Sequence, residues 1–277
     1  MKLRLWVLLA VWAGMGTNAR SQPDDSVRVV GWLTEAMRLP ADSCLTLFFA
    51  RKLEGVPYKA GTLDASPREQ LVARTDSLDC MTFVETVVAL SRCARVKAHT
   101  FGAFKEQLRL VRYRHGVMGG YASRLHYVSD WIADNTRKGV LQERTRSFPF
   151  ARQRVLSLGF MSAHAGRYPV LAHRPQVLRQ LLAVEQRWKN YAMPYIPTSK
   201  VGDPSVLSAI REGDILVITT SIEGLDATHM GFAIRQGGVL KLLHASSRRG
   251  CVTLSRPLPS YLKEIRNTGI RVISLLP

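Results

Sequence analysis

Cys80 has sequence surroundings that suit a catalytic nucleophile. The stretch SLDCMTFVETVVAL predicts a helix from Asp79 to about Arg92, with Ser77 or Asp79 as its N-cap. A thiol in the first turn of a helix lies at the positive end of the helix dipole, which favours the thiolate. We therefore expect a lowered pKa for the Cys80 thiol, although the neighbouring Asp79 carboxylate opposes this shift weakly.

Two histidines flank a predicted β-hairpin in the stretch THMGFAIRQGGVLKLLHASS. If the turn is centred between Gln236 and Gly237, paired residues have numbers that sum to 473, which places His229 opposite His244. Their Cβ atoms would then lie roughly 5 Å apart on one face, provided that no bulge shifts the register. Two alternatives stay open: unrelated strand-end histidines, or metal ligands, for which no third ligand occurs at a recognisable spacing.

A cysteine and two histidines can together form a nucleophilic site. The thiol needs a base that removes its proton, and the base needs a third group that fixes its tautomer. Gly231 and Ala233, on the face predicted for the histidines, are small, so the Cys80 helix could pack closely there. We expect His229 to be the base and His244 to be the orienting group.

The elements that must position these residues change in type along the chain. Helix-periodic stretches precede a last quarter of short β-prone runs separated by turns, which predicts an α+β domain with an antiparallel sheet. The predicted helices are Val27–Leu39, Asp42–Leu53, Asp79–Arg92, Phe101–Val111, Arg124–Asn135 and Pro175–Lys189, and the predicted strands are Ile215–Thr219, Met230–Ile234, Val239–Leu243, Val252–Leu254 and Ile270–Ser274.

The N-terminal residues predict export. Lys2 and Arg4 precede a short apolar run and a small-residue junction, which is typical of a signal peptide over residues 1–21. Residues 22–277 then form a single domain with an expected helical insertion at about 95–200. We expect a periplasmic or secreted monomer with no stable membrane anchor after signal cleavage.

The charge of the chain favours an anionic partner. The net charge is +18, and removal of residues 1–20 takes away three basic residues and no acidic ones, which leaves +15. The basic residues are scattered and form no nucleic-acid-binding motif, so we expect no nucleic acid as partner. The other cysteines, Cys44, Cys93 and Cys251, would lie in an oxidising compartment, and the sequence does not choose among their pairings.

Several motifs in a fixed order resemble the NlpC/p60 superfamily of papain-like cell-wall hydrolases, and most closely its N-acetylmuramoyl-L-alanine amidase-like branch, a former domain of unknown function. The resemblance covers most of the residues after the expected signal peptide. The motifs are GVPYKAGTLD (55–64), LDCMTFVET (78–86), YASRLHYVSDWIADN (121–135), GDILVITT (213–220), GLDATHMGFAI (224–234) and LLHASS (242–247).

The resemblance implies a papain-like fold in which N-terminal helices carry the nucleophile against a C-terminal antiparallel sheet. It implies Cys80 as nucleophile, His229 as base, His244 as third member and Tyr58 as a hydroxyl that assists the oxyanion. It implies no metal and no cofactor.

The segment 121–135 resembles a branch-specific insertion that shapes the substrate cleft. On a helix, Arg124, Tyr127 and Trp131 would share one face and could offer a guanidinium and rings to a peptide and a sugar, or form a core stripe. Three further candidate substrate-binding residues are Ser123, His126 and Asp226, although Asp226 could instead shape a turn.

The sequence therefore predicts an exported cysteine hydrolase whose partner is peptidoglycan or its muropeptide fragments. The resemblance implies cleavage of the amide between N-acetylmuramic acid and L-Ala through a thioester. Three alternatives stay open: a γ-D-glutamyl-diaminopimelate endopeptidase, a non-catalytic basic cell-wall-binding protein, and a secreted papain-like enzyme that acts on proteins.

Overall fold

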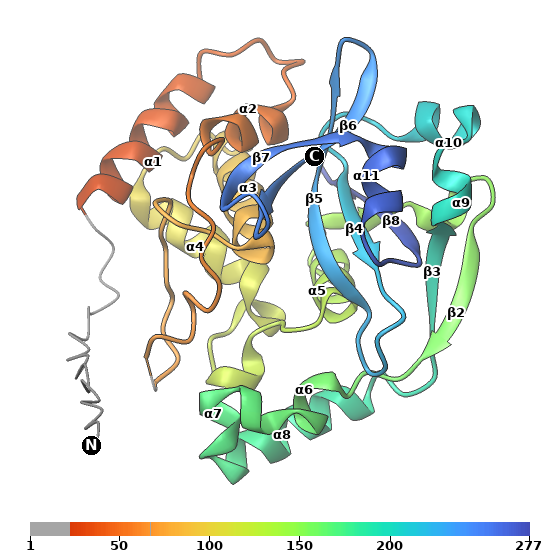
Figure 1. Ribbon diagram of the computed structural model, residues 1–277. Helices are drawn as coiled ribbons and strands as arrows, with labels where there is room; N and C mark the ends of the chain where they lie inside the picture. The colour runs from red at the N-terminus through yellow and green to blue at the C-terminus, as the bar shows by residue number, and fades with distance from the viewer. Residues whose placement is uncertain (1–22, 67) are drawn as a thin grey trace, which may run out of the picture.

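The structure, a computed structural model, describes residues 23–66 and 68–277 (Figure 1). The expected signal peptide lies outside the described residues. The predicted α+β class is confirmed: the first half of the chain is mainly helical, and the last quarter forms most of an antiparallel sheet. The α-helices are α1 (Pro23–Ala36), α2 (Leu45–Lys52), α3 (Cys80–Arg95), α4 (Phe101–Arg112), α5 (Val128–Arg137), α6 (Phe160–Ala163), α7 (Pro169–Ala172), α8 (Pro175–Gln186), α9 (Thr198–Val201), α10 (Pro204–Ala209) and α11 (Leu258–Glu264).

Eight strands form one open sheet in the described part of the chain. They are β1 (Leu141–Glu143), β2 (Arg152–Leu156), β3 (Tyr191–Pro197), β4 (Ile215–Thr219), β5 (Ala227–Gln236), β6 (Val239–Ser246), β7 (Cys251–Pro257) and β8 (Gly269–Leu275). The order across the sheet is β2-β3-β8-β4-β5-β6-β7, with β1 paired to β8, and every pair is antiparallel. The hairpin β5–β6 that carries the two histidines therefore lies toward one end of the sheet.

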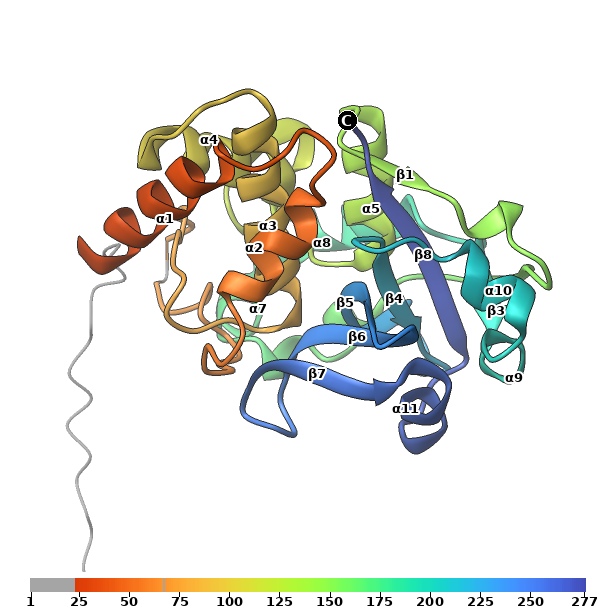
Figure 2. The same ribbon diagram turned by 90° about the horizontal axis from the view of Figure 1, so that it is seen from above.

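The two faces of the sheet bury different cores. On one face, α3 packs against β5, where the rings of Phe83 and Phe232 meet edge to face with centroids 5.5 Å apart. The other face packs against the short helices α9, α10 and α11, around Leu242, Leu258 and Leu262. Figure 2 shows α11 on the side of β6 and β7 away from α3.

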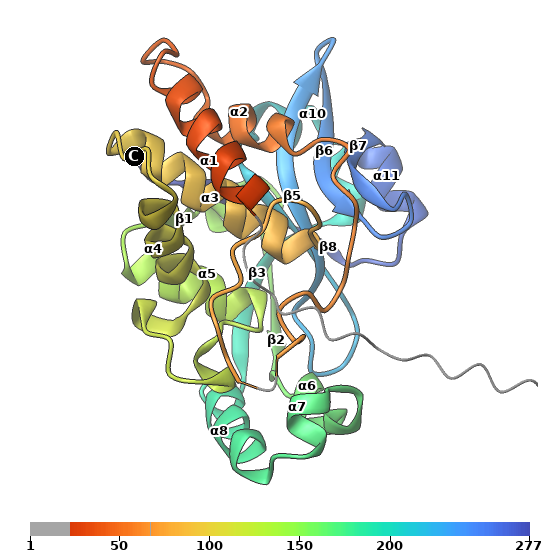
Figure 3. The ribbon, with the colours of Figure 1, turned by 90° about the vertical axis from the view of Figure 1, so that its left-hand side faces the viewer.

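The segment at about 95–200 is not wholly helical, contrary to expectation. It contains α4, α5 and the cluster α6–α8, but it also supplies β1, β2 and β3 to the sheet. Figure 3 shows α7 and α8 grouped at the end of the molecule away from α1. The three strands were missed because β1 is short and β2 and β3, at one end of the sheet, carry charged or proline residues in place of an alternating pattern.

No helix among the described residues is long and apolar enough to cross a membrane.

Candidate active site

Cys80 is the first residue of α3, as predicted. The Asp79 carboxylate accepts a hydrogen bond from the Thr82 backbone N–H at 2.8 Å, and the Asp79 N–H donates to the Thr82 hydroxyl at 2.9 Å. This reciprocal capping box identifies Asp79, rather than Ser77, as the N-cap. The cap fixes where the helix begins and so places the sulfur at its N-terminal end.

The prediction of a lowered pKa for the Cys80 thiol is wrong. Burial raises the pKa of Cys80 to about 12, and the Asp79 carboxylate raises it further. Backbone N–H groups of Met230, Met81 and Cys80 itself act in the opposite direction but are outweighed. The same residue that caps the helix thus opposes the thiolate, so the resting sulfur is a neutral thiol and needs a base.

The two histidines meet, although the predicted register is wrong by two residues. Nε2 of His229 lies 2.5 Å from Nδ1 of His244, and the ring centroids are 4.8 Å apart. The observed pairs, such as Phe232 with Leu243, have numbers that sum to 475. A shift of two keeps both side chains on one face, so the rings meet diagonally instead of directly across.

The turn explains the shift. Its central residues are Gly237 and Gly238, with φ values of 58° and 77°. A two-residue hairpin turn of this kind requires positive φ at both central positions, which glycine adopts without strain. The glycine pair therefore centres the turn one residue later than expected.

The predicted approach of the Cys80 helix to the Gly231–Ala233 face is also wrong. Helix α3 packs on the opposite face, where Phe232 points, while Ala233 belongs to the core beneath α11. A Cβ added to Gly231 would lie 2.8 Å from the Cβ of His244 and 2.5 Å from the carbonyl oxygen of Leu243. The absent side chain thus makes room for His244 rather than for the helix.

Cys80 reaches β5 at the backbone of Met230, the residue after His229. A β-bulge lies at this point, because Ile218 pairs with His229 whereas Thr219 pairs with Ala227. Bulges change the direction of neighbouring side chains and are common beside active sites. No hydrogen bond joins the thiol to His229 among the described residues, so a sulfur–nitrogen contact of about 4 Å stays a prediction.

Both imidazoles are neutral in the resting site. Burial lowers the pKa of His229 to about 3, with His244 contributing, and burial lowers the pKa of His244 to about 4. The shared hydrogen bond requires one ring to donate and the other to accept. If Nε2 of His229 holds the proton and donates to His244, then Nδ1 of His229 is free to accept a proton, which is the tautomer that a general base needs.

Two tyrosines lie near the thiol. Tyr58 pairs with Leu78 in an isolated parallel bridge, two residues before the nucleophile, and burial and the charges of Cys80 and Asp79 raise its pKa to about 12. Tyr261 of α11 packs against the His244 ring with centroids 5.2 Å apart, and burial raises its pKa to about 12 as well. The sequence predicted Tyr58 but not Tyr261, which follows a proline-rich turn in no recognised motif.

A cavity of about 400 Å³, the histidine-side cavity, opens beside the imidazole pair. It lies between β6, β7 and α11, and both His229 and His244 line it. The rest of its wall is formed mainly by hydroxyl-bearing side chains and by Arg248, Arg249 and Arg256. The arginines after β6 were not among the predicted site residues, since two adjacent arginines in a turn are an ordinary surface pattern.

A second cavity, the Arg124 cavity, has a volume of about 240 Å³ and is lined by Asp79 beside the nucleophile. The predicted residues Arg124, His126 and Tyr127 line it. The helical face predicted for Arg124, Tyr127 and Trp131 is wrong, because α5 begins only at Val128 and Arg124 has extended backbone. The aromatic ring of Tyr121 was missed, although it packs under the Arg124 guanidinium at 4.8 Å.

The groups of the Arg124 cavity are largely engaged with one another. The Arg124 guanidinium donates to Asp64 through Nη2, and its buried Nε lies 3.8 Å from Glu69 but makes no hydrogen bond. Tyr127 donates to Glu185 at 2.6 Å, and His126 bonds the Tyr121 carbonyl at 2.8 Å, with burial lowering its pKa to about 3. Arg124 is therefore the predicted residue best placed to meet a ligand here.

Three predicted substrate residues instead support the fold. Trp131 is fully buried in the main core, and the Ser123 hydroxyl closes the preceding turn by donating to the Gly120 carbonyl. Asp226 is 1% exposed and accepts from the backbone N–H groups of Ser129 and Ala227. Its carboxylate holds α5 against the start of β5.

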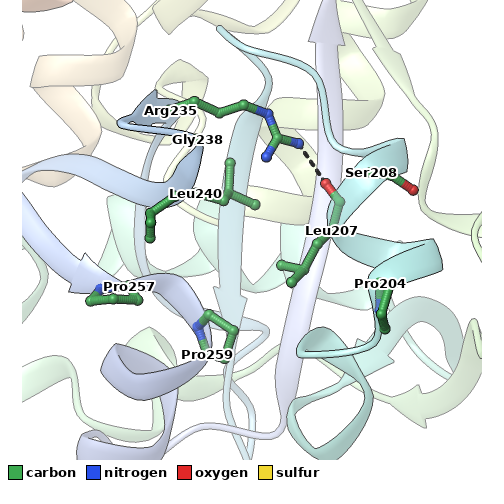
Figure 4. Close-up of a pocket in the computed structure, with 9 residues that line it drawn as sticks. Pro204, Leu207, Ser208, Arg235, Gly238, Leu240, Pro257 and Pro259 are labelled. Atoms are coloured by element: carbon green, nitrogen blue, oxygen red, sulfur yellow. Dashed lines mark hydrogen bonds between the residues drawn. The ribbon is translucent and has the colours of Figure 1, made fainter.

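The remaining cysteines are free in the structure, and Cys93 is completely buried in α3. No cluster of three or more potential metal ligands occurs among the described residues. A cavity of about 650 Å³ beside α10 and α11 is lined by proline and aliphatic side chains, and its Arg235 donates to the Leu207 carbonyl (Figure 4). This cavity is larger than the other two, but the Ser208 hydroxyl in its wall has no carboxylate or imidazole beside it among the lining residues.

Comparison with known proteins identifies the family of the chain. The family model for N-acetylmuramoyl-L-alanine amidase-like proteins (AmiA-like) matches residues 48–270, which include Cys80, His229 and His244. The chain belongs to this family.

Solved structures of similar proteins extend the match. An N-acetylmuramoyl-L-alanine amidase from Bacteroides uniformis is 38% identical, with a TM-score of 0.78 over 84% of this AmiA-like chain and 98% of its own. A Bacteroides fragilis protein described as a xylanase is 39% identical, with a TM-score of 0.75 over 82% of this chain and 99% of its own. A Legionella pneumophila protein shares the fold at 24% identity, with a TM-score of 0.70 over 92% of this chain and 95% of its own. No curated protein matches the chain.

Proposed function

We propose that this AmiA-like protein is a cysteine amidase of peptidoglycan that cleaves the bond between N-acetylmuramic acid and L-Ala. The observation that carries the proposal is a thiol at the start of a capped helix, next to the strand on which His229 contacts His244 at 2.5 Å. Family membership supports an amidase-like peptidoglycan hydrolase. The proposal includes four further points: the cysteine mechanism, membership of the papain-like NlpC/p60 superfamily, export directed by residues 1–21, and a monomeric state.

The mechanism follows from the neutral resting pair. His229 takes the thiol proton as the sulfur attacks the amide carbonyl, and the Cys80 backbone N–H, with the Tyr58 hydroxyl, stabilises the oxyanion. The C–N bond then breaks as protonated His229 gives its proton to the leaving amine, which leaves a thioester. Water attacks the thioester, His229 receives a water proton and returns it to the sulfur, and the acid is released. His244 accepts a hydrogen bond from His229 throughout and stabilises the imidazolium.

The name of the Bacteroides fragilis protein raises glycoside hydrolysis as an alternative, which this site supports less well. A glycosidase uses two carboxylates that flank the bond. Three carboxylates line the Arg124 cavity, but Asp64 pairs with Arg124, Glu85 pairs with Arg112, and Asp79 caps α3. Each is committed to a structural contact, whereas the thiol and the imidazole pair have no structural partner that explains them.

Mass spectrometry of purified muropeptides tests the proposal directly. The protein without residues 1–21 should release the intact stem peptide, and its Cys80→Ala variant should release none. Release of the diaminopimelate-containing fragment, with L-Ala-D-Glu left on the N-acetylmuramic acid, would instead indicate an endopeptidase with the same chemistry, and new reducing ends would indicate a glycosidase. Turnover by Cys80→Ala at the wild-type rate would refute the cysteine mechanism.

A further inference from the structure

The substrate has two ends, and two cavities border the proposed catalytic residues, one beside the imidazole pair and one beside Asp79, the neighbour of Cys80. The histidine-side cavity is lined by both imidazoles, whereas the Arg124 cavity is lined by Asp79 and by neither histidine. Hydrolysis of the muramoyl amide separates an uncharged sugar acyl group from a stem peptide that carries several carboxylates. The orientation of the substrate across the site can therefore be inferred from which cavity suits which end.

Proton transfer gives the first argument. The group that protonates the leaving amine must lie within hydrogen-bond reach of its nitrogen. In the proposed reaction that group is His229, and the amine belongs to the stem peptide. Since the imidazole opens into the histidine-side cavity, the peptide must depart on this side.

Charge gives an independent argument. Of the three arginines that line the histidine-side cavity, Arg256 is paired with Glu264 at 2.9 Å, whereas Arg248 and Arg249 lie in no ion pair among the described residues. The charge of Arg248 lowers the pKa of Tyr261, which places its guanidinium close to the ring that packs on His244. Two unneutralised guanidiniums therefore border the cavity and would attract carboxylates.

The Arg124 cavity has the opposite character. Its wall contains the carboxylates of Asp64, Asp79 and Glu85. Asp64 pairs with Arg124 and Glu85 pairs with Arg112, which leaves Asp79 as the carboxylate with no ion pair among the described residues. Tyr121 and Tyr168 add aromatic surface, which suits the apolar face of a sugar ring. An anionic peptide would be repelled here, whereas a neutral N-acetylmuramoyl group would not.

We propose that the histidine-side cavity binds the anionic stem peptide as the leaving group, with Arg248 and Arg249 facing its carboxylates. This inference rests on the proposed amidase function and adds the direction of the substrate and the residues that select for charge. Both arginines are exposed in the turn between β6 and β7, so their substitution need not disturb the core.

The test pairs two substrates with two protein variants. The substrates are N-acetylmuramoyl-L-Ala-D-Glu and its diamide, in which both glutamate carboxyls are neutral. We expect the wild type to prefer the charged substrate about tenfold through KM, and the R248Q/R249Q variant to lose this preference. Arg152→Gln removes a comparable exposed charge on β2, at the far end of the sheet, and should leave the preference unchanged.

The outcomes separate this inference from the proposed function. Equal loss of activity toward both substrates in R248Q/R249Q, or an unchanged preference, would overturn the peptide assignment while leaving the amidase intact. Calorimetry with free L-Ala-D-Glu asks the same question without turnover: the wild type should bind it at low salt, and R248Q/R249Q should bind it about tenfold more weakly. Equal binding by both proteins would overturn the inference even if no muropeptide is cleaved.

Discussion

Replacement of Gly231 by alanine should displace His244 and abolish most activity. The new Cβ would lie 2.5 Å from the Leu243 carbonyl oxygen and 2.8 Å from the His244 Cβ, whereas Cβ atoms in proteins essentially never come within 3.0 Å of another atom. The backbones of β5 and β6 must therefore separate by at least about 0.5 Å. His244 is 3% exposed, and its ring lies between His229 and Tyr261, so it cannot move alone.

The effect can be estimated separately for stability and for catalysis. Overpacking a well-packed site costs about 1–3 kcal/mol, which a domain of this size should survive. A displacement of about 1 Å in a catalytic constellation costs on the order of 100-fold in rate. We therefore expect Gly231→Ala to remain folded but to lose at least about 30-fold in kcat/KM on muropeptide, because the His229–His244 hydrogen bond is broken or bent.

The assay combines urea unfolding with initial rates on purified muropeptide. Gly31→Ala is the matched control: Gly31 lies in α1, with nothing within 4 Å of the added Cβ. It should raise the unfolding free energy by about 0.5–1 kcal/mol and leave the rate unchanged. A Gly231→Ala variant with a rate within threefold of the wild type would refute the claim that this glycine positions His244.

Three further predictions follow from buried groups. The pKa values of His229 and His244 in the folded protein lie below that of an unfolded histidine, which is about 6.5. Below pH 6.5 the unfolded state therefore binds more protons than the folded state. Lowering the pH from 7.5 to 5 should reduce the unfolding free energy by up to about 4 kcal/mol. Urea titrations at both pH values check this, and a double His→Gln variant with an equal pH difference would contradict it. Arg112→Met leaves Glu85, which is 1% exposed, without its ion-pair partner, and should lower the unfolding free energy by about 3–5 kcal/mol in denaturant unfolding. The double variant R112M/E85L should recover part of this loss. A loss below about 1 kcal/mol in the single variant would refute the prediction. Burial and the Asp79 carboxylate raise the pKa of the Cys80 thiol, so its rate of alkylation by iodoacetamide should be low at pH 7 and should still increase above pH 9. Peptide mass spectrometry measures this rate at Cys80. A rate that is constant between pH 5 and 8 would reveal a thiolate–imidazolium pair.

The sequence predicted the elements that carry the chemistry better than their contacts. The capped start of α3 and the extent of β4 could be read from local signals, because capping and strand periodicity involve neighbouring residues. The meeting of the histidines was also predictable, since an error of two residues in register preserves the face of a strand.

Features that depend on three-dimensional packing were not predictable. Which face of β5 meets α3 is decided by Phe232, not by the small residues Gly231 and Ala233, and both faces of this strand are buried. The pKa of Cys80 depends on how deeply the helix start is buried, which outweighs the dipole that the sequence suggests. Tyr261 lies seventeen positions after His244, and only the docking of α11 on the sheet brings the two rings together.

Strand β5 joins the two halves of the proposed site because it contributes to both from adjacent residues. The Met230 backbone meets the sulfur, while the preceding side chain, His229, bonds to His244 on the face covered by α11. In a regular strand neighbouring side chains point to opposite faces of the sheet. A thiol that contacted the side chain of Met230 would therefore be separated by the sheet from the His229 ring. The bulge lies just before these two residues: it adds Thr228 to β5 between Ala227 and His229, whereas His229 and Met230 keep their regular partners Ile218 and Val217. Because Met230 meets the sulfur with its backbone and not with its side chain, the alignment of nucleophile and base depends on the local backbone of β5 at His229 and Met230. Helices α3 and α11 therefore act on catalysis through the positions they impose on this one strand.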